Sequence, residues 1–238
     1  MALSVALTPS GLDADALAEQ AVVVVDVLRA STTICTALAN GARAVIPVAD
    51  KGEAGRLAAH LDRDATALGG ERGGKKLPGF ALGNSPAEYT AEAVRGRTVV
   101  LTTTNGTTAL VRARGAKRLA VGAFANAGAA VGFLQAALDD GLDATVLCAG
   151  WRGQVALEDA LCAGLLVDRL GARPEGDGAR IAQGLYLGTR ADLPRALRQS
   201  DHARRLEALG AGDDIAACAA IDTTTVLPTF RDNQLVAA

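Results

Sequence analysis

Residues 21–33, AVVVVDVLRASTT, decide the fold. Four consecutive valines form a run that is too short for a buried helix and has the β-branched side chains typical of a strand covered on both faces. The run ends at Asp26, and Arg29 and the hydroxyl residues Ser31–Thr33 follow before an apolar segment, Ile34–Leu38, that reads as helical. Hydroxyl residues favour a helix N-terminus, where free N–H groups and the helix dipole attract anions. The loop after this strand therefore suits a phosphate and a divalent metal ion.

The alternation of strand, loop and helix continues along the chain. Short apolar runs predict strands at Leu3–Leu7, Ala21–Val25, Ala44–Val48, Ala65–Leu68, Thr98–Leu101, Lys117–Val121, Ala144–Cys148 and Thr223–Leu227. Longer segments predict helices at Ala14–Gln20, Ile34–Leu38, Lys51–Leu61, Ala87–Val94, Asn126–Leu138, Ala156–Leu170, Ala179–Leu187, Leu193–Arg198, His202–Leu209 and Asp213–Ala220. This order predicts an α/β protein with three layers, α/β/α, around a mostly parallel or mixed sheet.

We expect one domain over residues 1–238, with the polar, Gly-rich segment Gly171–Gly178 as the best place for a subdivision. In parallel sheets, ligands bind beyond the carboxyl ends of the strands. Asp26, Thr102–Asn105 and Ala149–Trp151 each follow a predicted strand, so these loops are expected to converge.

The amino-acid composition argues against nucleic-acid-binding and membrane-spanning proteins. The chain has 238 residues, of which 50% are hydrophobic and only 3% aromatic, so the core must be aliphatic. A formal net charge of −2 argues against a nucleic-acid-binding protein. The sequence contains no apolar run long enough to span a membrane and no signal-peptide pattern at its start, so we expect a cytoplasmic protein without a membrane partner. Its four cysteines are scattered and are expected to be buried thiols.

The longest stretch without apolar periodicity is 69–86, GGERGGKKLPGFALGNSP. Its first residues resemble a phosphate-binding P-loop, but Lys76 stands where that loop needs Ser or Thr, and Leu77–Pro78 opposes the helix that should follow. We therefore expect an irregular loop whose glycines let backbone N–H groups approach an anion. A solvated charged loop is the alternative interpretation.

Each charged or hydroxyl group also has a plain structural interpretation. An unpaired Asp26 directly after four valines would be costly, which favours a metal ion or Arg29 as its partner. Glu158 and Asp159 begin a helix, where the dipole alone is a sufficient reason for acidic residues. Thr102–Thr108 could be a simple capped turn.

Other catalytic schemes fit poorly. Cys148 and Arg152 are too close in sequence for a cysteine phosphatase loop, and the two histidines are far from any nucleophile-like turn. An aspartyl-phosphate mechanism needs a second acid two residues after Asp26, where Leu28 stands.

Five motifs taken together resemble the 2-phosphosulfolactate phosphatase family. They are DVLRASTT (26–33), LGGERGGKKLPGFALGNSPAEY (68–89), TTNGT (103–107), CAGWRGQVALED (148–159) and SDHARRLEALGAGDDI (200–215). The resemblance extends over nearly the whole chain and implies a three-layer α/β/α fold and Mg²⁺-dependent hydrolysis of 2-phospho-3-sulfolactate to sulfolactate and phosphate, a step towards coenzyme M. It also implies that Asp26, Glu71, Glu158 and Asp159 serve the metal and the chemistry. Ala156 stands where a hydroxyl residue is expected.

The predicted site follows from the motifs. Asp26, Glu71 and Glu158 are assigned to Mg²⁺, and Asp26, Asp159 and Arg29 to catalysis, with Asp159 activating water. The phosphate and the rest of the substrate are assigned to Arg29, Ser31, Thr32, Asn84, Ser85, Asn105, Gly106 and Thr107. Arg72, Lys75 and Arg152 are assigned to the carboxylate and sulfonate, with Lys76 as a further cation of these loops.

Several alternatives stay open at this point. Water could attack directly, which we favour, or Asp26 could form a phospho-enzyme. The chain could act on another small phosphorylated acid, since fold and family do not fix the substrate, or bind an anion without catalysis. The number of metal ions is open, and so is the choice between a monomer and a homodimer.

Overall fold

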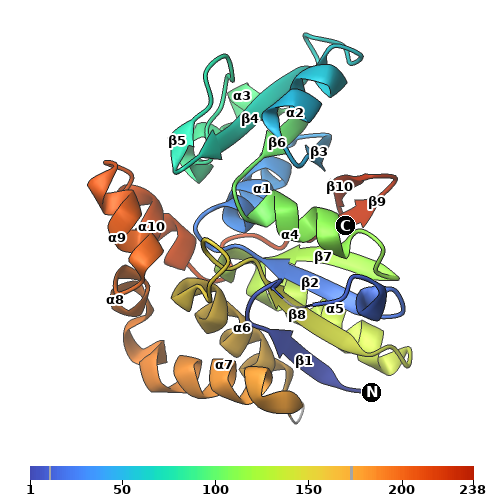
Figure 1. Ribbon diagram of the computed structural model, residues 1–238, viewed down its shortest axis with the longest axis vertical. Coiled ribbons are helices and arrows are strands. Elements are labelled where there is room, and N and C mark those ends of the chain that lie inside the picture. Colours follow the sequence, from blue (N-terminus) through green and yellow to red (C-terminus); the bar gives the residue numbers. More distant parts are fainter. Residues whose placement is uncertain (11, 172–173) are drawn as a thin grey trace.

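The computed structural model describes residues 1–10, 12–171 and 174–238, which form a ten-stranded sheet with helices on both faces (Figure 1). This confirms the predicted α/β class with a mostly parallel, mixed sheet. The strands are β1 (Leu3–Ala6), β2 (Ala21–Val25), β3 (Ala44–Pro47), β4 (Thr66–Arg72), β5 (Lys75–Lys76), β6 (Thr98–Thr102), β7 (Arg118–Gly122), β8 (Ala144–Cys148), β9 (Pro228–Arg231) and β10 (Gln234–Ala237).

Most helices lie close to their predicted positions, but two predictions are wrong in part. The predicted helix Ala14–Gln20 is only a 3₁₀ turn over Asp15–Leu17 without a side-chain cap, and Ala87–Val94 is divided between a 3₁₀ turn and a short helix that begins at Ala91. The helices are α1 (Ala30–Ala39), α2 (Lys51–Ala58), α3 (Ala91–Val94), α4 (Gly106–Ala113), α5 (Ala127–Asp139), α6 (Leu157–Leu170), α7 (Gly176–Thr189), α8 (Leu193–Arg198), α9 (Asp201–Ala208) and α10 (Asp213–Ala219). Four 3₁₀ turns within the described residues are η1 (Asp15–Leu17), η2 (Pro86–Glu88), η3 (Phe124–Asn126) and η4 (Arg190–Asp192). None of the helices in this part of the chain has both the length and the apolar character needed to cross a membrane.

The sheet consists of two parallel blocks joined by a hairpin. Strands β1, β8, β2 and β7 form one block, and β3, β6 and β4 form the other. The hairpin β9–β10 lies between them, with β9 antiparallel to β7 and β10 antiparallel to β3. The sheet order is therefore β1-β8-β2-β7-β9-β10-β3-β6-β4-β5.

Strand β2 contributes to both faces of the sheet, as expected for a buried valine run. Val23 and Val25 belong to the core under α5 and α6, whereas Val22 and Val24 belong to the core under α1 and α4. All five residues of β2 are buried. This burial on both faces leaves Asp26 as the first polar side chain at the carboxyl end of the strand.

The predicted strand at Thr223–Leu227 is wrong. These residues form no ladder, and the strand begins at Pro228. Asp232 and Asn233 have positive φ angles of 50° and 61° and form the two-residue turn between β9 and β10. Such turns match the twist of paired strands, and Asp and Asn adopt this conformation more readily than most residues. The pair Asp232–Asn233 was therefore the missed signal.

The expected irregular loop after Leu68 is in part a β-hairpin. Strand β4 continues to Arg72 and pairs with β5, and Gly73 and Gly74 form the tip with φ angles of 62° and 85°. A Cβ on Gly74 would lie 2.6 Å from Leu209 Cδ1, so the tip packs against the end of α9. The glycines thus serve a tight turn and a close contact, and no P-loop helix follows.

The segment Gly171–Gly178 lies partly outside the described residues, because 172 and 173 are not among them. Its end is helical, since α7 begins at Gly176. A subdivision there, and the single domain over 1–238, stay predictions.

Candidate active site

A cavity lies at the carboxyl ends of the strands. The loops after β2, β4, β6 and β8 and the helix α9 contribute to it. The lining residues are Asp26, Leu28, Arg29, Glu71, Gly73, Gly74, Asn84, Thr104, Asn105, Trp151, Arg152, His202, Arg205 and Leu206. Loops that are far apart in sequence therefore share one cavity.

Asp26 is almost completely buried, with 6% of its surface exposed. Its Oδ1 accepts a hydrogen bond of 3.3 Å from the N–H of Ala30 at the start of α1. Burial raises the pKa of Asp26 to about 6, and repulsion from Glu71 and Glu158 adds to the rise, while the charge of His202 lowers it. A carboxylate that is costly to ionise by itself suits a site that receives a cation.

The start of α4 packs directly against Asp26. A Cβ on Gly106 would lie 2.6 Å from Asp26 Oδ2, so glycine is required there. Asn105 lines the cavity, whereas Thr107 is buried, accepting the N–H of Thr103 and donating to its carbonyl at 3.0 Å. Within this predicted phosphate loop, Asn105 can contact a ligand and Thr107 fixes the backbone.

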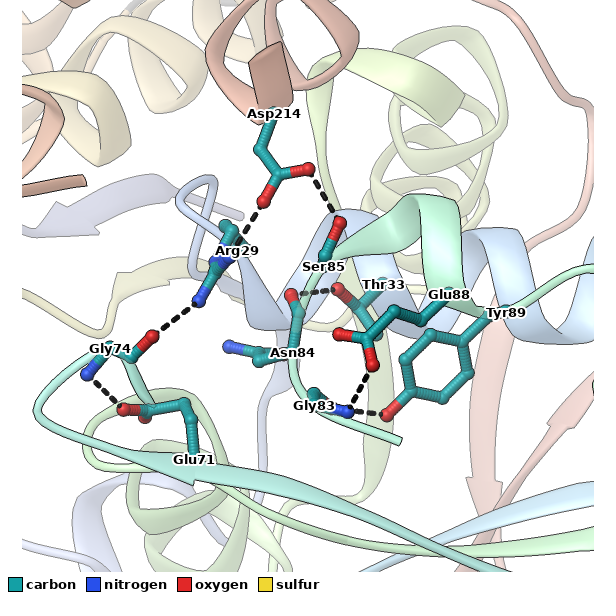
Figure 2. Close-up of polar contacts among 10 residues, drawn as sticks. All are labelled: Arg29, Thr33, Glu71, Gly74, Gly83, Asn84, Ser85, Glu88, Tyr89 and Asp214. Atoms are coloured by element: carbon teal, nitrogen blue, oxygen red, sulfur yellow. Dashed lines mark hydrogen bonds and ion pairs between the residues drawn. The ribbon is translucent and has the colours of Figure 1, made fainter. Parts of the chain in front are cut away.

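Arg29 is a buried cation whose charge is balanced inside the protein. Its Nη1 donates to Asp214 Oδ2 at 2.6 Å, and its Nη2 donates to the carbonyl of Gly74 at 3.3 Å (Figure 2). The second oxygen of Asp214 accepts the hydroxyl of Ser85 at 2.6 Å. Because a buried charge needs a partner, Asp214 sets the position of Arg29. Ser85, predicted to bind substrate, supports this pair instead of lining the cavity.

Glu71 joins two loops of the cavity. Its Oε1 accepts the N–H of Thr104 and its Oε2 the N–H of Gly74, each at 2.7 Å. The carboxylate thereby fixes the hairpin tip against the loop after β6. Each oxygen keeps a further lone pair for a cation.

Asn84 contributes a buried amide to the cavity. Its main-chain carbonyl accepts the hydroxyl of Thr33 at 2.8 Å, which anchors the segment on α1. Figure 2 shows its side chain pointing towards the space near Arg29 and Glu71. The Oδ1 atom is buried and has no hydrogen-bond partner among the described residues. An unpaired buried amide oxygen costs stability. As an acceptor it suits a cation or a hydrogen-bond donor, and the predicted contact of Asn84 with the substrate stays a prediction.

An aromatic and acidic network holds His202 at the cavity. Its Nδ1 lies 3.1 Å from Glu158 Oε1, and its ring stacks on Trp151 with centroids 5.3 Å apart. The guanidinium of Arg152 lies 4.5 Å from the Trp151 ring centroid. Glu158 Oε2 is buried without a partner in the described part of the chain. Since Nδ1 faces Glu158, the other ring nitrogen of His202 is left for a ligand.

Besides Ser85 and Thr107, the predicted ligand residues that do not line the cavity are Ser31, Thr32, Arg72, Lys75, Gly106 and Glu158. The Ser31 hydroxyl accepts the N–H of Asp26 at 2.8 Å, and the Thr32 hydroxyl donates to Val27 at 3.0 Å. Arg72 bonds to Thr102 Oγ1 at 2.9 Å and to the carbonyl of Ala49 at 3.1 Å. Lys75 is exposed on β5, as is Lys76.

Asp159 lies beside the cavity but outside its lining. Its Oδ1 accepts the N–H of Val27 at 2.8 Å and its Oδ2 the N–H of Gly150 at 3.0 Å. These bonds join the loops after β2 and β8. Burial raises the pKa of Asp159, and the neighbouring charges of Asp26 and Glu158 raise it further.

The donor set fits a hard cation, though not as a ready-made cage. Over residues 1–10, 12–171 and 174–238, no three His, Cys, Asp or Glu side chains lie together as a metal site. Two carboxylates, Asp26 and Glu71, line the same cavity. Mg²⁺ commonly takes one or two carboxylates and completes its shell with water and substrate phosphate oxygens. The residues present therefore fit Mg²⁺ better than a metal that needs a full protein cage.

Four residues at or directly behind the cavity were not predicted from the sequence: Trp151, His202, Arg205 and, as the partner of Arg29, Asp214. All four lie in motifs that were recognised, 148–159 and 200–215. The signal was present in the second motif, because His202, Arg205 and Leu206 share one face of a helix at spacings of three and four residues. Nothing in the sequence showed that Asp214 pairs with Arg29.

The fold and the cavity define an α/β protein with a cavity lined by charged and polar side chains at the carboxyl ends of its strands. Comparison with known proteins gives the family. The family model for 2-phosphosulpholactate phosphatase matches residues 6–233, and the chain belongs to this family of phosphoric monoester hydrolases.

Individual relatives agree with the family model. A protein of Symbiobacterium thermophilum is 42% identical over 227 residues, covering 94% of this chain and 96% of the relative. One from Gloeobacter violaceus is 43% identical over 206 residues, covering 87% and 86%. One from Thermotoga maritima is 40% identical over 214 residues, covering 90% of each. All three are named probable 2-phosphosulfolactate phosphatase.

Proposed function

We propose that this protein hydrolyses 2-phospho-3-sulfolactate to 3-sulfolactate and phosphate, with Mg²⁺ as cofactor. The observation that supports this most is the shared cavity, in which Asp26 and Glu71 lie together with Arg29 in a chain of this family. Family resemblance adds a cytoplasmic location and a role in the formation of coenzyme M to the proposal.

In this proposal Asp26 and Glu71 hold the metal ion. Glu158, which the sequence also assigned to the metal, does not line this cavity and acts here by holding His202 through its Oε1. Bound Mg²⁺ would neutralise charge on the phosphate and on the leaving oxygen. Arg29 and Asn105 contact the phosphate from opposite loops. Phosphoryl transfer depends mainly on such positioning and charge stabilisation.

We propose direct attack by water. Leu28 lines the cavity at the position where an aspartyl-phosphate mechanism needs a second acid. Asp159, whose two oxygens accept backbone N–H groups, acts in this proposal by holding the loops that carry Asp26 and Trp151. It is thus a positioning residue.

The test is release of phosphate from a panel of phosphomonoesters, with Mg²⁺ and with EDTA. We expect activity with Mg²⁺, loss in EDTA, and the highest kcat/KM for phosphosulfolactate. Asp26→Asn should abolish turnover and keep the melting temperature at or above that of the wild type, because a costly buried charge is removed. Asp64→Asn, on an exposed loop, is the matched control. Anion binding without phosphate release would reject the proposal.

A further inference from the structure

Two arginines at the cavity have no acidic partner in the described part of the chain. Arg152 lies over the Trp151 ring, and the guanidinium of Arg205 forms no ion pair or hydrogen bond with any described residue. Arg29, by contrast, is neutralised by Asp214. The cavity therefore has two cations whose charge is available to a ligand.

The backbone of α9 fixes the place of Arg205. His202, Arg205 and Leu206 all line the cavity, and their spacing places them on one face of the helix. The Ser200 hydroxyl accepts the N–H of Ala203 at 3.0 Å and caps this helix. The hairpin tip at Gly74 packs against Leu206 and Leu209 and so holds the C-terminal end of α9. Arg205 is thus presented by an anchored element.

Arg29 and a metal ion would not balance all the negative charge of the proposed substrate. Its phosphate is assigned to the Asp26 end of the cavity, which leaves a carboxylate and a sulfonate. Arg72 and Lys75, which the sequence assigned to these groups, do not line the cavity. A planar guanidinium binds such oxyanions with two parallel hydrogen bonds.

Building on the proposed function, we propose that Arg205 determines specificity by binding, together with Arg152, the anionic end of the substrate remote from the phosphate. The site is thereby selective for small phosphate esters that bear a second strong anion, such as a sulfonate. Esters without that anion leave Arg205 unpaired and gain nothing from it.

The experiment compares Arg205→Gln with Arg204→Gln in the full chain. Arg204 is the adjacent residue of α9, is exposed, and pairs with Asp201 outside the cavity. Each variant is assayed with phosphosulfolactate, with phospholactate, which lacks the sulfonate, and with a neutral aryl phosphate. We expect Arg205→Gln to lower kcat/KM for phosphosulfolactate by about 10- to 100-fold, chiefly through KM, and to leave the aryl phosphate nearly unchanged. Arg204→Gln should leave all three unchanged, and Arg205→Lys should recover part of the loss.

A second measurement separates this inference from the proposed function. Calorimetry with 3-sulfolactate and with inorganic phosphate should show weaker sulfolactate binding in Arg205→Gln and equal phosphate binding. If the wild type releases no phosphate but this difference remains, the proposed function is wrong and the role of Arg205 stands. An equal loss on all substrates, or no loss at all, would overturn the inference.

Discussion

Buried charges around the cavity are held by partners from distant parts of the chain. Arg29 and Asp214 pair at 2.6 Å although they are 185 residues apart in sequence. His202 and Glu158 pair over 44 residues. Each pair places one side chain, Arg29 or His202, at the cavity and its acidic partner outside the cavity lining. The chemistry of the cavity therefore depends on residues that do not themselves touch a ligand.

Removing Asp214, the partner of Arg29, should destabilise the folded protein. We expect Asp214→Ala to lower the free energy of unfolding by about 3–5 kcal/mol, because it leaves the Arg29 guanidinium buried and unpaired. The adjacent Asp213 is exposed, so Asp213→Ala should change the free energy of unfolding by less than about 1 kcal/mol. Urea unfolding of both variants measures the difference, and equal stabilities would show that the pair does not hold the fold.

At the scale of elements, the helices are placed by small residues as well as by apolar faces. Gly164 of α6 faces α7, where an added Cβ would lie 2.0 Å from the carbonyl oxygen of Ala182. Glycine thus lets the two helices approach closely. Gly184 of α7 is exposed, and a Cβ there would meet nothing within 4 Å.

Alanine substitutions at these two glycines should change the stability of the protein in opposite directions. Gly164→Ala should destabilise the protein by about 1–3 kcal/mol, because backbone cannot move aside as a flexible side chain can. Gly184→Ala should stabilise it by about 1 kcal/mol, since alanine is the better helix former. Thermal unfolding followed by circular dichroism compares them, and a destabilising Gly184→Ala would contradict the packing described for α7.

For the whole molecule, the cavity depends on the two parallel blocks of the sheet. Asp26 and Trp151 follow strands of one block, and Glu71 and Thr104 belong to the other. The C-terminal hairpin β9–β10 pairs with both blocks and joins them. The last residues of the chain are thus part of the framework that brings Asp26 and Glu71 together.

The pH dependence of the protein's stability should reflect the buried carboxylate of Asp26. The pKa of Asp26 is raised from 3.8 to about 6 in the metal-free protein, so its contribution to stability is fully present below pH 3.8 and is lost as the pH rises through about 6. Bound Mg²⁺ would offset the free-energy cost of burying the ionised carboxylate of Asp26. We expect Mg²⁺ to raise the melting temperature more at about pH 7.5 than at about pH 5, and Asp26→Asn to abolish the difference. A Mg²⁺ effect that is independent of pH and persists in Asp26→Asn would count against Asp26 as a ligand.

The sequence by itself determined the fold class, the family and the loops that carry function. A strand buried on both faces needs a continuous apolar run, so the valines before Asp26 were visible without a structure. The motifs also contained every residue that lines the cavity. Local signals of this kind depend only on neighbours along the chain.

Only the tertiary structure decided which of these residues face the cavity and which charges are balanced. Ser31, Thr32, Arg72 and Asp159 proved to hold loops, while Arg205 and His202 line the site. The physical reason is that burial and pairing depend on groups brought together from distant strands and helices. A hydroxyl or a guanidinium in a motif can bond to its own backbone or to a ligand, and the packing around it selects between the two.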